Sequence, residues 1–423
     1  MFGGKESGRR HVELAVVGAG PAGVSAALQA AELGVETVVL DEQARLGGRM
    51  LSQVHQHPRK RGEWINGPAL VGDLVTRARR AGVEFVPQAE VWGLWPGWTL
   101  AIGGPAAVRT IEARAVLIAT GAAQTGLPFP GWTRPGVISA GAAQVMLHQH
   151  RVLPGRRALV VGADPLALAV AQELALVGVG VAGVVLPPPG PTTAAMASPR
   201  QAIASVARLA GLASLDGPAA MRFLGTVAGA FRRLPGPGAW LYPRGGIEVQ
   251  GVPLLFRRCI VEAVGETSVR QAVLADLTPQ GKIIPDSEES IDVDVICVSG
   301  GLHPLVELAD SSGECRLAYI KELGGRVPLH GPDMQTTAPG LFVAGSAGGV
   351  EGAAVAIAQG TLAGIGVAAS LERISRAEAA GLLAEAAKGV ETSRKEALLS
   401  FHPAVGKGRA RLAELWGEMR RRS

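Results

Sequence analysis

Cysteine and aromatic residues are scarce in this chain of 423 residues. The three cysteines, Cys259, Cys297 and Cys315, lie too far apart in the sequence to form a CxxC motif or a four-thiolate cluster site. We expect each to be a small buried or half-buried residue in a reducing compartment. Because aromatic residues make up only 4% of the chain, we expect no base-stacking platform and no nucleic-acid partner.

The chain also lacks a basic surface spread over its whole length. The formal net charge is +5, but residues 373–423 alone contain 11 Lys and Arg against 6 Glu, which accounts for the entire excess. We expect this segment to be a solvated basic helical tail. Docking of the tail to a partner or to an anionic surface is the alternative.

No apolar run precedes the first predicted strand, so we expect no signal peptide. The longest apolar segment, residues 158–186, is long enough to span a bilayer. It contains Asp164, Pro165 and Glu173, and the positions of its turn-forming residues predict a strand, a turn and a helix. We therefore predict a buried βαβ unit, no transmembrane segment and a cytoplasmic protein.

Hydrophobic residues are abundant at 48%, and the length predicts two or three domains. Residues 12–41 carry the strongest local signal. An apolar run at 14–17 leads into a glycine-rich turn, an alanine-rich segment extends to Gly34, and a second apolar run ends in Asp41. This order predicts a strand, a turn, a helix and a second strand.

The spacing of the glycines in this stretch is typical of a dinucleotide site. Gly18 permits the tight turn, Gly20 allows the backbone to approach a pyrophosphate, and Gly23 allows close packing of helix on strand. The N-terminus of the helix offers free N–H groups to phosphates. Asp41 lies 18 residues after Gly23, where an acid accepts hydrogen bonds from a ribose hydroxyl, which favours FAD or NAD over a 2′-phosphate cofactor. A glycine-rich turn without a ligand is the alternative.

The segments that follow continue an α/β pattern. We expect a helix at 70–81, a third parallel strand at 83–86, a small antiparallel meander at 92–109 and a strand at 114–121. His55 and His57 share one side of an extended segment, but no third metal ligand is evident, so a structural pair is favoured over a metal site.

Residues 157–186 repeat the opening pattern with a degenerate turn. Asp164 stands where the second glycine belongs and Ala167 where the third belongs. A carboxylate at that point repels phosphates, so we expect the fold to survive while tight NAD(P) binding is lost. NAD(P) is possible but disfavoured.

The second half of the chain is less regular. Residues 187–244 are predicted to be an insertion with helical pieces at 202–212 and 219–233, and residues 249–296 contain short strands that bury Cys297. Residues 337–346 are predicted to form a turn and a strand that ends at a glycine. A long apolar helix is predicted at 352–370. The N-terminus of that helix would face an electron-rich ring with its positive end.

The chain resembles the two-dinucleotide-binding flavoproteins of the pyridine nucleotide-disulfide oxidoreductase superfamily over residues 12–372. Four motifs carry the resemblance: the GAGPAG turn at 18–23, Ala-Thr-Gly at 119–121, the second strand–turn–helix at 160–178 and PGLFVAG at 339–345. The DEQ…GG, LPFPGW…PGV and LPGRR segments that begin at 41, 127 and 153 are most similar to the α subunits of dye-linked amino-acid dehydrogenases of the opine oxidase, proline or hydroxyproline dehydrogenase and hydrogen cyanide synthase type.

The resemblance implies an α/β fold with two Rossmann-like three-layer dinucleotide-binding domains and a helical C-terminal tail. FAD would bind the domain formed by 1–126 and 327–372, residues 127–326 would form a degenerate NAD(P)-like domain, and 373–423 would be the tail. The cofactor-binding residues it implies are Gly18, Gly20, Pro21, Ala22, Gly23, Asp41, Glu42, Gly48, Arg49, Val91, Ala119, Thr120, Gly121, Gly345, Ser346, Gly352, Ala353 and Ala354.

Three departures from the family pattern limit what it implies. Ser346 replaces the usual aspartate of the last FAD motif, Asp164 weakens the second nucleotide site, and residues 388–423 contain no cysteine for a [2Fe-2S] cluster. Electrons would then leave by flavin-to-flavin transfer or through a separate subunit.

Three functions are compatible with the sequence. The first is the electron-relaying α subunit of a hetero-oligomeric amino-acid or imino-acid dehydrogenase, whose partner is an amine-oxidase-type β subunit that carries its own flavin. The second is a self-contained NAD(P)H-dependent FAD reductase of a quinone, ferredoxin or dye, and the third is a non-catalytic nucleotide-binding subunit. Disulfide reductase activity is excluded because no two cysteines are close in sequence. No catalytic residue can be assigned, because hydride transfer in this fold depends mainly on the cofactor.

Overall fold

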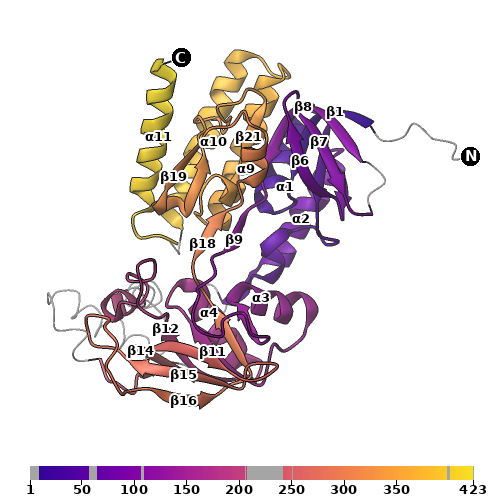
Figure 1. Ribbon diagram of the computed structural model, residues 1–423. Coiled ribbons are helices and arrows are strands. Elements are labelled where there is room, and N and C mark those ends of the chain that lie inside the picture. The colour runs from indigo at the N-terminus through magenta and orange to yellow at the C-terminus, as the bar shows by residue number, and fades with distance from the viewer. Residues whose placement is uncertain are drawn as a thin grey trace, which may run out of the picture. The chain divides into compact units, whose positions relative to one another are not determined.

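The computed structural model describes residues 9–56, 64–105, 109–204, 206, 242–249, 251–397 and 401–422. The chain divides into two compact units (Figure 1). The first comprises Met1–Gln53, Asn66–Ala123 and Leu302–Ser423, and the second Val54–Ile65 and Gln124–Gly301. Residues 302–326, which were expected in the second domain, belong to the first unit, and so does the C-terminal tail.

The described residues of the first unit form a seven-stranded sheet in the order β5-β2-β1-β8-β7-β6, with β21 also paired to β8. Pairing is parallel from β5 through β8 and to β21, whereas β6, β7 and β8 form the predicted antiparallel meander. The strands are β1 (Arg9–Val17), β2 (Thr37–Asp41), β5 (Glu84–Pro87), β6 (Glu90–Trp95), β7 (Thr99–Gly103), β8 (Thr110–Ile118) and β21 (Leu341–Val343).

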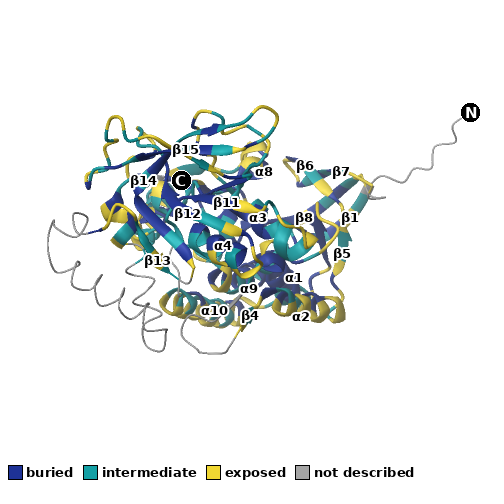
Figure 2. Ribbon diagram, turned by 90° about the horizontal axis from the view of Figure 1, so that it is seen from below, coloured by how far each residue is buried: buried dark blue, intermediate teal, exposed yellow. Residues whose placement is uncertain are grey.

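The two faces of this sheet are covered by different layers. Along β1, Leu14 and Val16 pack with the helices, whereas Ala15 and Val17 pack toward the meander and α8, as the twofold alternation of a strand requires. The helices are α1 (Pro21–Glu32), α2 (Gly67–Arg80), α8 (Glu307–Ser311), α9 (Ala353–Ser370) and α10 (Arg376–Glu396). Figure 2 shows α1 and α9 as mostly buried elements.

Helix α9 is long and apolar enough to cross a membrane by composition, but it is a core helix. Its residues Val355, Leu362 and Val367 are buried in the same hydrophobic cluster as Leu14 and Val16 of β1. This packing is sufficient to explain its apolar sequence, because a helix that contacts neighbours on several sides is hydrophobic all round.

The C-terminal tail differs from the solvated helix that its charge predicted. It forms α10 and α11 (Val405–Arg422), and Leu412 of α11 is buried against Ile320 and Leu323. Val390 of α10 joins the main core of the first unit. Most basic residues of the tail are exposed, but Arg394 and Arg409 pair with the buried Glu351. Net charge alone therefore does not predict how the tail packs on the unit.

The remaining elements of the first unit are short. They are η1 (Gly48–Ser52), β18 (Leu302–Pro304), β19 (Leu317–Ile320), η3 (Lys321–Leu323), β20 (Gly325–Pro328) and η4 (Gly345–Ala347). Of these, η4 connects β21 to α9, and β19 pairs antiparallel with β20 beneath α11. Two further short strands, β4 (Trp64–Asn66) and β9 (Ala122–Gln124), each include residues of both units.

The second unit contains an eight-stranded sheet among its described residues, in the order β10-β17-β11-β12-β14-β15-β16 with β13 paired to β14. Residues 158–186 form the predicted βαβ unit, β11–α4–β12. The elements are β3 (Val54–Gln56), β10 (Val137–Ser139), α3 (Ala140–Val145), η2 (Met146–His150), β11 (Arg157–Val161), α4 (Pro165–Leu176), β12 (Gly180–Leu186), β13 (Ile247–Val249), β14 (Val252–Val264), β15 (Gln271–Asp276), β16 (Glu289–Asp292) and β17 (Val295–Val298). Most of the predicted insertion helices lie outside the described residues.

Candidate functional site

The glycine turn after β1 is built as a dinucleotide motif requires. Gly18 has φ +106°, and a Cβ there would lie 2.4 Å from the Ala119 carbonyl oxygen. A Cβ on Gly23 would lie 1.9 Å from the Gly18 carbonyl oxygen, so no larger side chain fits at the first turn of α1. The turn therefore brings the start of α1 directly onto the ends of β1 and β8.

Helix α1 begins without a side-chain cap. Gly20 is its N-cap residue, and within the described part of the chain no side-chain cap is found at this helix start. A Cβ on Gly20 would meet no atom within 4 Å, whereas a Cβ on Gly48 would lie 3.0 Å from the Gly20 Cα. The first turn of α1 thus presents open backbone amides beside the Gly48 loop, a combination that suits an anion.

Asp41 at the end of β2 is tied to the same turn. Its Oδ2 accepts a hydrogen bond from the Ala19 amide at 2.6 Å, and its Oδ1 accepts one from the Gln43 amide at 2.8 Å. Burial raises the pKa of Asp41, although these two hydrogen bonds oppose the shift. Each carboxylate oxygen still has a lone pair for a ligand hydroxyl.

The Ala119–Thr120–Gly121 segment closes the opposite side of the turn. The Thr120 hydroxyl donates to the Leu305 carbonyl at 2.9 Å, and the Leu305 amide donates to the Gly121 carbonyl at 3.1 Å. These bonds fix the segment between β8 and the chain that returns at 302–305, so long-range contacts as well as local ones hold it beside Gly18.

The late glycine motif meets the early one through helix packing. A Cβ on Gly345 would lie 2.7 Å from the Ala22 Cβ. In α9, a Cβ on Gly360 would lie 2.2 Å from the Ala22 carbonyl oxygen, and one on Gly364 would lie 2.5 Å from the Ala26 carbonyl oxygen. Gly360 and Gly364 are four residues apart, and so are their partners Ala22 and Ala26. Helices α1 and α9 therefore run side by side in the same direction.

This register places the N-terminus of α9 ahead of that of α1. Ala353 lies seven residues before Gly360, whereas Pro21 lies one residue before Ala22. Helix α9 therefore begins six residues earlier, roughly 9 Å along the axis. Gly352 is its N-cap, again with no side-chain cap, and Ala353 and Ala354 are exposed. Two uncapped helix N-termini thus stand in tandem at one edge of the sheet.

The other predicted residues surround this edge less tightly. Glu42 and Arg49 are exposed, and Val91 on β6 and Ser346 in η4 are half-buried. The Gln43 side chain donates to Glu42 at 3.0 Å.

The corresponding turn of the second unit is closed by its own aspartate. Asp164 is the N-cap of α4, and its Oδ1 accepts hydrogen bonds from the amides of Leu166 at 2.9 Å and Ala167 at 3.1 Å. Burial raises the pKa of Asp164, and the hydrogen bonds oppose the shift. The donors that would hold a pyrophosphate are occupied, so the turn does not fit a dinucleotide.

The three cysteines are poor candidates for redox chemistry, because burial disfavours their thiolates. Burial raises the pKa of Cys259 and Cys297 to about 12 and that of Cys315 to about 11. Across the described residues no group of three or more His, Cys, Asp or Glu could hold a metal ion. Of the suggested histidine pair, His57 lies outside the described residues.

A cavity of about 590 Å³ lies elsewhere in the first unit, between the 314–339 segment and α11. Its lining includes none of the predicted cofactor residues. We assign the candidate site from the helix N-termini and the glycine contacts, because these match the chemistry of a dinucleotide and the cavity does not.

Comparisons with known proteins agree with this architecture. Residues 12–195 match the family described as "Pyridine nucleotide-disulphide oxidoreductase", and residues 327–375 match "Glucose inhibited division protein A". The two matched segments contain the early glycine turn and the late glycine motif, which the fold brings together at α1 and α9.

Curated relatives include opine oxidase subunits from two organisms. The one from Rhizobium meliloti is 28% identical over 85% of this chain and 71% of the relative, and the one from Agrobacterium tumefaciens is 28% identical over 86% and 66%. Hydrogen cyanide synthase subunit HcnB of Pseudomonas aeruginosa is 26% identical over 86% of this chain and 72% of the relative. The chain spans about two thirds to seven tenths of the length of these relatives.

Among solved structures, L-proline dehydrogenase from P. horikoshii matches with a TM-score of 0.60 and 18% identity, covering 91% of this chain and 61% of that one. Thioredoxin reductase from T. acidophilum matches with a TM-score of 0.58 and 18% identity, covering 86% and 100%. At this identity the matches establish the fold, two Rossmann-like domains with additional C-terminal helices.

Proposed function

We propose that this chain, a member of the pyridine nucleotide-disulphide oxidoreductase family, is the FAD-binding subunit of a hetero-oligomeric dehydrogenase of amino or imino acids. In this proposal a partner flavoprotein oxidises the substrate. The present chain receives the electrons and passes them to an external acceptor.

The observation that carries the proposal is the contrast between the two helix N-termini. Helix α1 has Gly20 as its N-cap and open amides, whereas α4 has its amides satisfied by Asp164. Of the two turns, the first fits a dinucleotide pyrophosphate and the second does not. A reductase that uses NAD(P)H needs both, so an electron source other than a pyridine nucleotide is favoured.

The residues of the first unit fit FAD. The amides at the start of α1 and the Gly48 loop would hold the pyrophosphate, and Asp41 would accept hydrogen bonds from the adenosine ribose. The N-terminus of α9, roughly 9 Å further along, would face the ring with its positive end. When bound, FAD supplies the electron-accepting and electron-donating ring. The chain orients that ring and adds a favourable field for negative charge on it.

The partner and substrate class rest on the relatives. The opine oxidase and hydrogen cyanide synthase relatives are both named as subunits. No pair of the three cysteines forms a disulfide, and all three have raised pKa values, so a thiol relay is disfavoured. Flavin-to-flavin transfer from an amine-oxidase-type partner to this chain is consistent with the subunit names and requires no reactive thiol.

Affinity purification of the tagged chain from its native host tests this proposal. We expect a second flavoprotein to co-purify, and the complex to reduce an artificial dye when supplied with an amino or imino acid. The isolated chain should bind FAD but should not oxidise these substrates. A monomeric preparation with full amino-acid dehydrogenase activity would refute the assignment.

A further inference from the structure

Glu351 is a buried carboxylate one residue before the N-cap of α9. Its side chain is 6% exposed. Arg394 donates to both of its oxygens, from Nη2 at 2.7 Å and from Nε at 3.0 Å, and Arg409 donates from Nη1 at 2.5 Å. A carboxylate held by two guanidinium groups in a water-poor position is a strongly fixed charge cluster.

The same carboxylate is connected to the glycine motif after β21. Gln359, which is 4% exposed, donates from Nε2 to Glu351 at 3.2 Å and accepts at Oε1 from the Gly345 amide at 3.0 Å. These two hydrogen bonds of Gln359 therefore connect both ends of the loop between Gly345 and the first turns of α9. Because Gly345 also contacts Ala22, the cluster is connected to the start of α1 through this loop.

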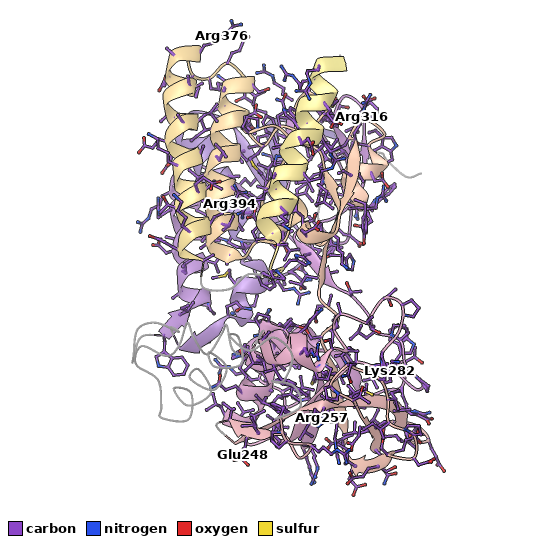
Figure 3. The ribbon with its side chains drawn as sticks, turned by 90° about the vertical axis from the view of Figure 1, so that its left-hand side faces the viewer. Glu248, Arg257, Lys282, Arg316, Arg376 and Arg394 are labelled. Atoms are coloured by element: carbon purple, nitrogen blue, oxygen red, sulfur yellow. The ribbon has the colours of Figure 1, made fainter. Side chains whose placement is uncertain are left out.

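The two arginines come from separate C-terminal elements. Arg394 lies in the last turn of α10, where Figure 3 labels it, and Arg409 lies early in α11. Phe401, from the segment between these helices, is the nearest atom group to a Cβ placed on Gly352, at 3.7 Å. Three points of the tail therefore converge on the N-terminus of α9.

Two roles are compatible with such a cluster. It could simply attach α10 and α11, although buried ion pairs give little net stabilisation because desolvation offsets their attraction. It could also act on whatever binds at the N-terminus of α9. The hydrogen bonds to the loop through Gln359 and the location beside the uncapped helix end favour the second role.

We propose that Glu351 is a positioning residue for the flavin, and that Arg394 and Arg409 set the electrostatic field at the N-terminus of α9. This inference rests on the proposed FAD site. The cluster holds the loop between Gly345 and Gly352 in its ligand-binding conformation. The charges of the cluster act on a ring held at the N-terminus of α9, so removing the anion and removing a cation must have opposite effects.

The test compares Glu351→Gln, Arg409→Gln and the double variant in FAD-loaded protein. Arg411→Gln is the matched control, because Arg411 lies on the same helix but pairs with the exposed Glu414. The readouts are the flavin reduction potential and the affinity for sulfite, which adds to oxidised flavin and leaves negative charge on the ring. Melting temperature is recorded for each variant.

We expect sulfite affinity to rise about threefold or more in Glu351→Gln and to fall about threefold or more in Arg409→Gln, the effect of one charge at intermediate distance and screening. The reduction potential should rise and fall in the same order. The double variant should return toward the wild-type values, and Arg411→Gln should not change them.

Equal sulfite affinities in all variants, or shifts in the same direction for both single variants, would overturn the inference. If Glu351→Gln does not fold, Arg409→Gln and the double variant still give the required comparison. Failure of the wild-type chain to take up FAD would instead overturn the proposed function, so the two failures are distinguishable.

Discussion

Asp41 accepts a hydrogen bond from the Ala19 amide at 2.6 Å, which ties the end of β2 to the glycine turn that follows β1. The acid proposed to bind the ribose and the turn proposed to bind the pyrophosphate are therefore joined by a direct hydrogen bond. A second hydrogen bond from the Gln43 amide fixes the other carboxylate oxygen. The acid is pre-oriented before any ligand arrives, which lowers the ordering cost of binding.

Asp41→Asn should weaken FAD binding by about tenfold or more, because an amide replaces an ionised acceptor with one oxygen and a donor, at a cost of about 1.5–3 kcal/mol. Fluorescence titration of apo-protein with FAD measures this. Unchanged affinity would show that Asp41 does not contact the ribose.

The same residue predicts a pH dependence. Burial raises the pKa of Asp41, so its carboxylate protonates at a higher pH than a free aspartate does. FAD affinity should therefore fall as the pH drops through this raised pKa, and Asp41→Asn should remove that dependence. By linkage, the contribution of Asp41 to the free energy of unfolding is greatest below its unfolded pKa and decreases as pH rises through the folded pKa.

Gly20→Asp should abolish FAD retention while leaving the apo-protein folded. No atom lies within 4 Å of a Cβ at this position, so the substitution adds charge without a clash. Gly72→Asp, on an exposed position of α2 with equally open surroundings, is the control and should keep its flavin. Visible absorption and thermal melting of both variants check this, and a large loss of stability in Gly20→Asp would contradict it.

Asp164→Ala should destabilise the protein by about 0.5–2 kcal/mol, because α4 loses its N-cap. Asp164→Asn keeps an acceptor and removes a buried charge. Since burial raises the pKa of Asp164, the wild type loses stability as the pH rises through that pKa. The free energy of unfolding of Asp164→Asn, relative to that of the wild type, should therefore increase with pH. Urea denaturation at acid and neutral pH measures the difference, and neither variant should alter flavin content.

Asp164→Gly should likewise leave flavin retention intact, and it should improve binding of NADH by freeing the amides of Leu166 and Ala167. Isothermal titration with NADH tests this. If the variant binds NADH no better than the wild type, features other than the cap close the second site.

Cysteine alkylation at neutral pH should be slow at every position. The pKa values are raised to about 11 at Cys315 and about 12 at Cys259 and Cys297, so the thiolate fraction is small. Mass spectrometry after iodoacetamide treatment should find Cys315 modified first, because it alone is not fully buried. Rapid modification of a thiol in the native protein would reopen thiol chemistry.

Local signals predicted the secondary structure around the candidate site, whereas the binding roles of its residues stay predictions. The strand, turn, helix and strand over residues 9–41 and the α9 start at Ala353 follow from residues that are close in sequence. Asp164 was identified as incompatible with a phosphate, but its role as an N-cap was missed. Its position directly before Pro165 is a helix-start signal that could have revealed it.

Long-range features could not be predicted in this way. Glu351 pairs with Arg394 and Arg409, which lie 43 and 58 residues later on different helices. The charge of the tail predicts a solvated helix, because composition does not show that Leu412 is buried on its inner face. The division into compact units also differs from the predicted boundary at residues 302–326, because Leu305 bonds Thr120 and Gly121 across a large sequence separation.

The central claim is that the turn before α1 can bind a dinucleotide and the turn before α4 cannot. An anaerobic titration of the FAD-loaded chain with NADH tests this claim most directly. We predict one FAD per chain whose visible absorption is unchanged by NADH or NADPH and is bleached by dithionite. Rapid bleaching by either nicotinamide would show that the second site works and would contradict the account.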